Sequence, residues 1–503
     1  LTLGNFTNTA TVANTETITG GSGADTVTLD SALTTAMSLD LGTGANKLTL
    51  AAAGNTGTVS EVQTLIGGTG ADAVTLGTAV TNGSIDLGAG SDTLTLANGT
   101  NAATVANTET ITGGTGNDTV TLTTAVSNAS VDLGTGSDSL TFGNFANTAS
   151  VANTETITAG SGADAITLGT ALTTGMAVDL GAGSNKLTLA NVANTGTVKN
   201  TTTLIGGSGA DTITLGAAAA NASIDLGAGS DTLTFGNFAN SATVANTETI
   251  TGGTGADTVT LATALTTAMS LDLGTGANKL TLASGGNTGT VSDVQTLIGG
   301  TGADTITLGT IVSNGSVDLA GGSDTLTLGA FNNTATVANT ETIAGGTGND
   351  TVTLGTALTT GMSVDLGTGA NKLALANVAN TGAVSNVNTL TGGSGNDAIT
   401  LGTNLTNGSV DLGGGSDTLT LAAGGNVISL ANIETINGGT GADTVTLTAA
   451  IANGSIDLAG GSDTLTFGAF TNTATVANTE TITGGSGADT VTLDSALTTA
   501  MSL

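Results

Sequence analysis

Hydrophobic and polar residues alternate in short stretches along the whole chain. Examples are residues 25–29 (DTVTL), 84–88 (SIDLG), 47–50 (KLTL) and 16–20 (ETITG). Because successive side chains of a strand point to opposite faces, this period of two predicts β-strands with one apolar face. Thr, Val and Ile favour the pleated backbone, and the Gly, Asn and Ser residues between the stretches are typical of turns. No stretch has convincing helical spacing, so residues 31–39 (SALTTAMSL) are predicted to form a corner.

A glycine-rich phrase precedes many of these strands. Its full form, GGxGxD, occurs eleven times at intervals of 46 or 47 positions, with one Gly replaced by Ala159, and we call each copy a strong loop. A weaker form that ends in Asp or Asn lies between successive strong loops, and we call it a weak loop. The short step, from strong to weak loop, is 20 or 21 positions, and the long step, from weak to strong loop, is 26 positions. The repeat therefore has two unequal halves, each with one glycine loop.

Short strands in tandem repeats, without helices to cover a sheet, predict an all-β parallel β-solenoid in which each coil stacks on the next. We expect two unequal coils per repeat, one for the short step and one for the long step, although a single coil for the whole repeat is an alternative. With one coil, Asp40, Asp86 and their successors would stack as bare carboxylates on every coil. With two coils they alternate with Thr19, Ile66 and their equivalents. The longer coil contains an extra segment such as residues 54–62, which we expect to form an added side or a bulge.

A longer period lies above the repeat. Residues 1–39 return as residues 465–503 with two changes, Leu3 to Phe467 and Asn5 to Ala469. The offset of 464 positions equals ten repeats and suggests a gene built from duplicated blocks. We therefore expect residues 1–503 to form a single continuous solenoid and to be an excerpt of a longer protein.

The composition of the chain excludes several kinds of active site and binding partner. The chain has no His, Cys, Trp, Tyr, Pro or Arg, which excludes disulfides, thiol catalysis and the usual general base near neutral pH. A formal charge of −33 with five Lys argues against nucleic acid and against anionic membrane surfaces. No apolar run approaches the ~18 residues that a membrane-spanning helix needs. A hydrophobic fraction of 38% does not fit a disordered acidic tail.

The strong loops resemble a known family of repeats. Residues 20–28 (GGSGADTVT) and 113–121 (GGTGNDTVT) match the GGxGxDxUx nonapeptide of RTX proteins, in which U is a large apolar residue. This resemblance implies that loops on neighbouring coils hold Ca²⁺ between them, that the protein is secreted by type I export from a bacterium, and that calcium outside the cell drives folding. The loops here are separated by the short and long steps, whereas the nonapeptides of the family follow one another directly in tandem.

The chemistry of the loops supports calcium independently. Ca²⁺ prefers six to eight hard oxygen ligands, glycines let backbone carbonyls turn toward one point, and each loop adds one carboxylate. The candidate metal ligands in the strong loops are Asp25, Asp72, Asp118, Asp164, Asp211, Asp257, Asp304, Asp350, Asp397, Asp443 and Asp489. Those in the weak loops are Asp92, Asp138, Asp231, Asp324, Asp417 and Asp463. The alternative is that the glycine loops are plain corners, in which Asp257 and its equivalents cap their own turns by accepting local backbone N–H groups.

Four lysines each follow a weak loop that ends in Asn: Lys47, Lys186, Lys279 and Lys372. In one interpretation their ammonium groups replace the cation between coils, and in the other they are inherited, solvated strand residues. Either way these coils should bind calcium poorly. Two further rows of acids, the Glu row beginning with Glu16 and Glu109 and the Asp of each "DLG" phrase, are predicted to lie on solvated outward faces.

The sequence favours a non-enzymatic structural protein: an extracellular fibre, S-layer-like surface coat or adhesin stalk stiffened by calcium. We expect it to associate with itself, end to end or laterally, in a way that depends on divalent ions. The first alternative is an ice-binding or other surface-binding solenoid, because outward Thr rows occur, although the loop Thr changes to Ser22 or Ala89 in other copies. The second is a polysaccharide-cleaving β-helix that uses paired carboxylates, although every acid belongs to a repeating row.

Overall fold

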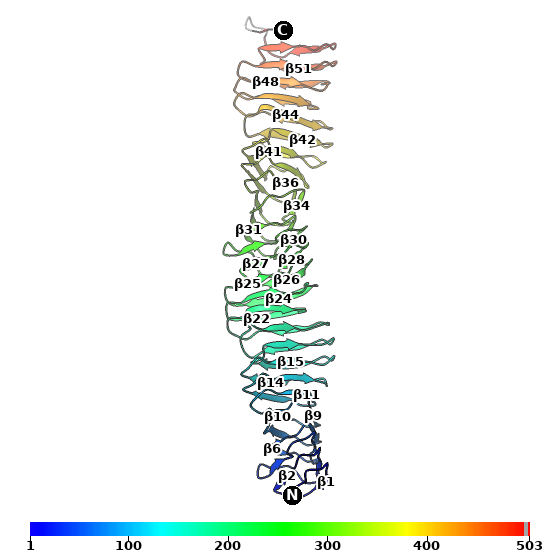
Figure 1. The fold of residues 1–503 in the computed structure, drawn as a ribbon. Coiled ribbons are helices and arrows are strands. Elements are labelled where there is room, and N and C mark those ends of the chain that lie inside the picture. Colours follow the sequence, from blue (N-terminus) through cyan, green and yellow to red (C-terminus); the bar gives the residue numbers. More distant parts are fainter. Residues whose placement is uncertain (497–500, 503) are drawn as a thin grey trace. The chain divides into compact units, whose positions relative to one another are not determined.

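The chain forms short parallel strands that wind into a β-solenoid, as the sequence predicts (Figure 1). The computed structural model describes residues 1–496, 501 and 502. It has two compact units, residues 1–254 with strands β1 (Thr9–Val12) to β27 (Thr249–Thr251) and residues 255–503 with strands β28 (Thr258–Leu261) to β53 (Thr490–Leu493). In the described part of the chain, no helix is long and apolar enough to cross a membrane.

Within each unit the strands alternate between two parallel sheets, because each strand pairs with the strand two places along the chain. In the first unit, one sheet includes β8 (Ala73–Leu76), β10 (Thr93–Thr95), β12 (Thr110–Gly114), β14 (Ala129–Gly134) and β16 (Thr148–Ala152). The other includes β9 (Gly83–Gly88), β11 (Ala102–Ala106), β13 (Thr119–Leu122), β15 (Ser139–Thr141) and β17 (Thr156–Thr158). The second unit repeats this arrangement, for example in β33 (Thr305–Leu308), β34 (Gly315–Asp318), β35 (Thr325–Thr327), β36 (Thr334–Ala338) and β37 (Thr342–Gly346). One coil is therefore two strands, one in each sheet.

The strand registers correct the predicted division of the repeat into coils. Ala73 pairs with Thr93 and Thr93 pairs with Thr110, so the spacings between coils, |i−j|, are 20 and 17. A spacing of 21 occurs where Thr26 pairs with Lys47. The coil predicted for the short step is confirmed, but the long step is one and a half coils. A repeat thus contains five strands, or two and a half coils, instead of two unequal coils or a single coil.

The cause of this difference is an additional strand. Residues 54–62, expected to form an added side or bulge, contain β6 (Thr56–Ser60), which pairs with β8 over four residues. Its pattern places Gly57 and Val59 inward and Thr56 and Thr58 outward. Five strands per repeat is an odd number, so equivalent strands of consecutive repeats belong to opposite sheets.

The core is the stack of inward side chains. Val74, Leu94, Ile111, Val131 and Val151 follow one another through five coils of one sheet, and none is more than 1% exposed. Each coil buries this apolar face only against its neighbours, as in other solenoids. At about 25 cal/mol per Å² of apolar surface, this row and its partner in the facing sheet supply the main stabilisation.

The outward rows avoid a continuous line of charge. Asp132 pairs with Thr112 on one side and with Ala152 on the other, and Asp86 lies between Ile66 and Ala106. The expected alternation of Asp with uncharged residues is confirmed for these positions.

The corrected coil length can be tested with engineered disulfides, because the natural chain has no Cys. Thr95 and Thr112 are paired residues on adjacent strands, and strands ~4.8 Å apart place Cα atoms within disulfide range. We expect Thr95→Cys with Thr112→Cys to form a disulfide under mild oxidation, seen as a mass loss of two hydrogens. The control pair, Thr95→Cys with Thr121→Cys, is separated by one long step and lies in different sheets, so it should stay reduced within one chain. Disulfide formation by the control pair instead would contradict the registers.

Candidate metal centre

Polar side chains at the corners join successive coils in a ladder of hydrogen bonds. In one example the backbone N–H of Val80 donates to Asn101 Oδ1 (3.1 Å), and that of Asn101 donates to Asp118 Oδ1 (2.9 Å). The N–H of Asp118 donates to Asp138 Oδ1 (2.7 Å), and that of Asp138 donates to Glu155 Oε2 (2.7 Å). Each side chain therefore accepts the backbone donor of the coil before it. We call this arrangement an Asx ladder.

The Asx ladder is buried, although it is built from amides and carboxylates. Asn101 and Asp118 are 0% exposed. Asn101 Nδ2 donates to the carbonyls of Ala97 (2.8 Å) and Gly99 (2.9 Å) in its own turn and to Asp118 Oδ1 (2.8 Å). Since an unpaired polar group at such a site would cost about 1–3 kcal/mol, these bonds hold both the turn and the contact between coils.

Consecutive Asx ladders occupy opposite corners. The ladder with Asp72 precedes strands of one sheet, and the ladder with Asp118 precedes strands of the other. This follows from the five strands of the repeat.

The structure brings each strong loop next to the weak loop that follows it. Six ladders then contain two Asp on adjacent coils and continue to a Glu, and we call these acid ladders: Asp72–Asp92–Glu109, Asp118–Asp138–Glu155, Asp211–Asp231–Glu248, Asp304–Asp324–Glu341, Asp397–Asp417–Glu434 and Asp443–Asp463–Glu480. Four contain a strong-loop Asp followed by Asn, and we call these amide ladders: Asp25–Asn46, Asp164–Asn185, Asp257–Asn278 and Asp350–Asn371. The remaining predicted ligand, Asp489, accepts from Asn472 Nδ2. A weak loop is not brought next to the strong loop that follows it, because the long step leads to the opposite corner.

The Glu row was assigned to a solvated face from the sequence; Glu16 is exposed, but the interpretation is wrong for the six Glu that follow a weak-loop Asp, which are half-buried. Glu109 Oε2 accepts the N–H of Asp92 at 2.8 Å, so the Glu is a member of the ladder. A signal for this was present in the sequence: each weak-loop Asp is followed at a constant spacing by Glu, whereas a weak-loop Asn is followed there by Gln63, Thr202, Gln295 or Asn388. A weak-loop Asp is thus followed at this position by an acidic residue, and a weak-loop Asn by a neutral one.

Burial leaves some carboxylate oxygens without a partner. Among the described residues, the buried Oδ2 atoms that have no hydrogen bond belong to Asp25, Asp92, Asp138, Asp164, Asp211, Asp231, Asp324, Asp350, Asp397, Asp417 and Asp463. All six weak-loop Asp are in this set. An unpaired anionic oxygen in a buried site is unfavourable, and either a proton or a cation beside it removes the penalty. Because the set also includes Asp25, Asp164 and Asp350 of the amide ladders, the unpaired oxygen alone does not distinguish the two kinds of ladder.

The pKa values of the weak-loop Asp respond to the same environment. Desolvation by burial raises the pKa of Asp92 from its usual 3.8; the hydrogen bond from the N–H of Asp72 opposes this, and repulsion from the Asp72 and Glu109 carboxylates adds to it. The same causes raise the pKa of the other weak-loop carboxyls, Asp138, Asp231, Asp324, Asp417 and Asp463.

The acid ladders fit calcium in their donor chemistry. Within the described residues no three acidic side chains converge on one point, so a bound ion would also need backbone carbonyls. The glycines leave room for these: a methyl group at Gly67 would overlap the Leu87 carbonyl oxygen and lie 2.7 Å from Asp72 Oδ2. Carboxylate and carbonyl oxygens are the ligands that Ca²⁺ prefers.

The alternative role, capping of the local turn, is also present. Asp72 Oδ2 accepts the N–H of Gly68 at 3.3 Å, and the same bond recurs at Asp304, Asp443 and Asp489. In these loops the strong-loop Asp is a structural cap, whereas Oδ2 of five other strong-loop Asp has no hydrogen bond: Asp25, Asp164, Asp211, Asp350 and Asp397.

The lysines do not take the place of a cation. Lys47 is exposed in β5 (Lys47–Thr49), where it pairs with Thr26 and Thr64. The group that contacts the corner carbonyls is the amide of the preceding Asn46, with Leu41 O at 3.1 Å. The first interpretation of the lysines is wrong for this reason.

The Asp of each "DLG" phrase serves a second set of corners. Asp86 Oδ1 accepts the N–H of Gly88 (3.1 Å) and Nδ2 of Asn107 (2.8 Å). Asn107 has a φ of 50°, a left-handed conformation that Asn tolerates better than most residues. Its own N–H donates to Thr124 Oγ1 at 2.9 Å, so this row also connects coils.

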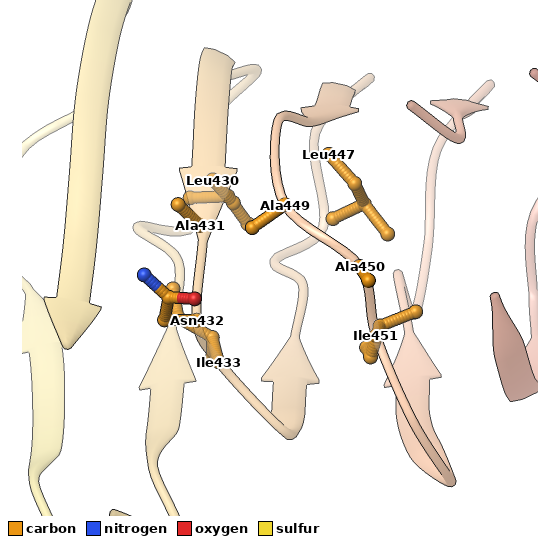
Figure 2. A pocket seen from close by; sticks show the side chains of 8 residues that line it. All are labelled: Leu430, Ala431, Asn432, Ile433, Leu447, Ala449, Ala450 and Ile451. Atoms are coloured by element: carbon orange, nitrogen blue, oxygen red, sulfur yellow. The ribbon is translucent and has the colours of Figure 1, made fainter. Parts of the chain in front are cut away.

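Apolar corners are closely packed. Leu430, Ile433, Leu447 and Ile451 line a cavity of only about 10 Å³ together with small Ala side chains and Asn432 (Figure 2). Such a space is barely large enough for one water molecule and is no ligand pocket.

Parallel coils with buried, oxygen-rich corners define a calcium-binding repeat solenoid. The family model of the RTX calcium-binding nonapeptide repeat (4 copies) matches nine segments: residues 13–31, 105–122, 201–219, 244–261, 292–310, 337–356, 385–403, 431–448 and 477–495. These segments are similar to the RTX nonapeptide repeat, a repeat whose family binds Ca²⁺. RTX repeat proteins are generally secreted, and repeats in a β-solenoid fit a structural repeat protein that is typically non-catalytic. A comparison with curated proteins found no match.

The Asx ladder can be tested by removing one amide. Asn101→Ala leaves the N–H of Val80 without its acceptor and removes the Nδ2 donor from Asp118 Oδ1, which keeps only the backbone N–H of residue 101, so we expect the free energy of local unfolding to fall by about 1–3 kcal/mol. Native-state hydrogen exchange of the flanking coils measures this loss. The exposed neighbour is the control: Asn98→Ala should change it by less than about 0.5 kcal/mol. Equal effects of the two substitutions would argue against the ladder.

The raised pKa values predict an unusual pH dependence without calcium. A carboxyl whose folded pKa is raised contributes stability that is fully present below its unfolded pKa of 3.8 and is lost as pH rises through the folded value. In EDTA the melting temperature should therefore be higher at about pH 4 than at about pH 7, the reverse of ordinary acid denaturation. Melting curves followed by circular dichroism check this. A melting temperature that falls steadily from pH 7 to pH 4 would contradict the assignment.

Proposed function

We propose that this chain is a calcium-stiffened structural solenoid outside the cell, which forms part of a fibre, a surface coat or an adhesin stalk. The observation that carries the proposal is the pairing of buried carboxylates on adjacent coils, with the second oxygen of every weak-loop Asp unpartnered. The proposed metal ligands are drawn from the Asp of the paired loops.

Calcium supplies positive charge shared between coils. The chain's own residues form the binding site for the ion. The backbone N–H of each strong-loop Asp donates to Oδ1 of the weak-loop Asp and so orients its carboxylate, and the glycines leave space at the corner that a Cβ atom would fill. Without the ion, the formal charge of −33 opposes compaction. Because binding requires the folded corners, binding energy adds directly to stability.

A mechanical or coating role suits the uniform coils. Each coil satisfies the strand edge of the next, so length can grow by repetition without new exposed edges. The acids recur in ladders and rows along the chain, whereas a carboxylate-based polysaccharide-cleaving site would need one pair with distinct environments. RTX repeat proteins are generally secreted, and calcium is abundant outside the cell, so the family match supports an extracellular location.

Self-association is the proposed partner interaction. Outward acidic residues, such as Asp86 in one sheet and Asp132 in the other, repel those of another copy unless divalent ions lie between them. Lateral or end-to-end contact should therefore depend on calcium.

Ice binding is not favoured by the outward rows. Thr75, Thr95 and Thr112 follow one another on three coils, but Asp132 and Ala152 come next. A surface that matches ice would need Thr to continue along the row.

The proposal predicts that calcium controls folding. Titrating Ca²⁺ into the EDTA-treated chain should increase the β signal in circular dichroism and raise the melting temperature with the logarithm of free calcium. Each site should add about 2.7 kcal/mol at a concentration of 100 Kd. Mg²⁺ at equal ionic strength is the control, and it should be weaker because it demands octahedral geometry. If the β signal and melting temperature ignore calcium, the proposal is wrong.

A further inference from the structure

The amide ladders contain a nest of three carbonyl oxygens around one N–H₂ group. Asn46 Nδ2 donates to Leu41 O (3.1 Å), Gly42 O (2.8 Å) and Glu61 O (2.9 Å). The first two carbonyls belong to its own turn, and the third belongs to the next coil. The same three contacts, at 2.9–3.2 Å, recur at Asn185, Asn278 and Asn371.

The acid ladders place a carboxylate in the same frame. Asp92 Oδ1 accepts the N–H of Asp72 at 2.7 Å, as Asn46 Oδ1 accepts that of Asp25 at 2.8 Å. The N–H of Asp92 donates to Glu109 at 2.8 Å, as that of Asn46 donates to Gln63 at 2.7 Å. With one side-chain oxygen and the backbone fixed alike, the remaining atom, Oδ2 of Asp92, takes the position of Nδ2 of Asn46.

The residues that form the nest are also equivalent. In the acid ladder they are Leu87, Gly88 and Asn107, at the same offsets from Asp92 as Leu41, Gly42 and Glu61 have from Asn46. Gly88 and Asn107 have positive φ angles of 86° and 50°, and their counterparts Gly42 and Glu61 have 67° and 55°. An anionic oxygen therefore faces the nest that an N–H₂ group occupies elsewhere.

An oxygen cannot donate to carbonyls, so the acid nest lacks a positive partner. Asp92 is 1% exposed and its Oδ2 has no hydrogen bond, and this holds for all six weak-loop Asp. The carboxylates of Asp72 and Glu109 lie on the adjoining coils and add negative charge. A divalent cation fits both requirements, since it accepts carbonyl and carboxylate oxygens and neutralises the paired charge.

We propose that calcium binds at the carbonyl nest of each acid ladder, beside Oδ2 of the weak-loop Asp, and that each amide ladder closes the same nest with its own Asn and needs no metal. The six sites are at Asp92, Asp138, Asp231, Asp324, Asp417 and Asp463. This inference rests on the proposed function and specifies which coils bind. It also accounts for the neutral residue that replaces Glu after each Asn, because an amide ladder has no cation to balance a second acid.

The order of the ladders then matters. Amide ladders at Asn46, Asn185, Asn278 and Asn371 alternate with one or two acid ladders, so metal-free clamps recur along the chain. Since each coil is stabilised mainly by its neighbours, these clamps hold local structure before calcium arrives.

The first test counts bound calcium in the full chain by isothermal titration calorimetry. The natural chain should bind about six tightly held Ca²⁺, one for each acid ladder. The acid-to-amide variant changes all six weak-loop Asp to Asn and the six following Glu to Gln. We expect it to lose these sites and to keep its β signal in EDTA.

The acid-to-amide variant could lose calcium binding simply because it misfolds. A reverse variant, in which binding sites are gained, excludes that explanation. It combines Asn46→Asp, Asn185→Asp, Asn278→Asp and Asn371→Asp with Gln63→Glu, Thr202→Glu, Gln295→Glu and Asn388→Glu. Its stoichiometry should rise to about ten, and its melting temperature in EDTA should fall. A control variant removes four charges outside the acid ladders, by Asp→Asn at Asp40, Asp179, Asp272 and Asp365, whose carboxylates accept glycine N–H groups beside the amide ladders. It should still bind about six ions.

The second test uses the natural chain as its own control. Hydrogen exchange in EDTA should speed up at the N–H groups of Asp72 and Asp92 by at least about tenfold relative to those of Asp25 and Asn46. Equal acceleration in both kinds of ladder would overturn the inference. So would an acid-to-amide variant that binds as much calcium as the natural chain, although calcium-dependent folding would then stand. A natural chain that binds no calcium would overturn both proposals.

Discussion

The structure depends on how the corners satisfy their backbone. A strand ladder pairs the backbone groups within each sheet, but at a turn the N–H groups point along the stack and are buried by the next coil. Here a side-chain oxygen from that next coil accepts them, as Asp138 does for Asp118 and Asn101 does for Val80. Short strands can therefore stack without disulfides or covering helices. The same requirement puts a carboxyl or an amide at every such corner, which is why the choice between Asp and Asn becomes a choice about charge.

Five strands per repeat distribute these corners evenly. Because the number is odd, the acid ladder with Asp72 and the one with Asp118 belong to different sides of the coil. Neither side then collects all the negative charge. Between the acid ladders, the amide ladders carry one acid where the others carry three, so repulsion along one corner is interrupted. The odd number of strands therefore sets which side each acid ladder occupies, and with it the spacing of negative charge and of the candidate metal sites.

Much of the fold could be predicted from the sequence. The period of two identified strands such as β3 (Thr26–Leu29), and the glycine phrases placed the corners and the candidate carboxylates. The coil count could not be obtained from the loops alone, because residues 54–62 lack a glycine phrase and yet form β6. The role of Glu109 was missed because its partner is the backbone of Asp92 on the preceding coil, and side-chain exposure cannot be inferred from alternation at a turn. The role of Asn46 was also missed. The charge of the neighbouring Lys47 suggested an ionic contact, whereas the amide of Asn46 is the group that donates to the corner carbonyl of Leu41.

The half coil in each repeat has a consequence for how such a gene can change length. Deleting or adding one repeat would rotate every later corner by half a turn, so that faces formerly aligned would no longer match. A pair of repeats restores the phase, because together they make a whole number of coils. The long block that returns in this sequence holds ten repeats, an even number, so its duplication lengthens the protein while leaving each face continuous.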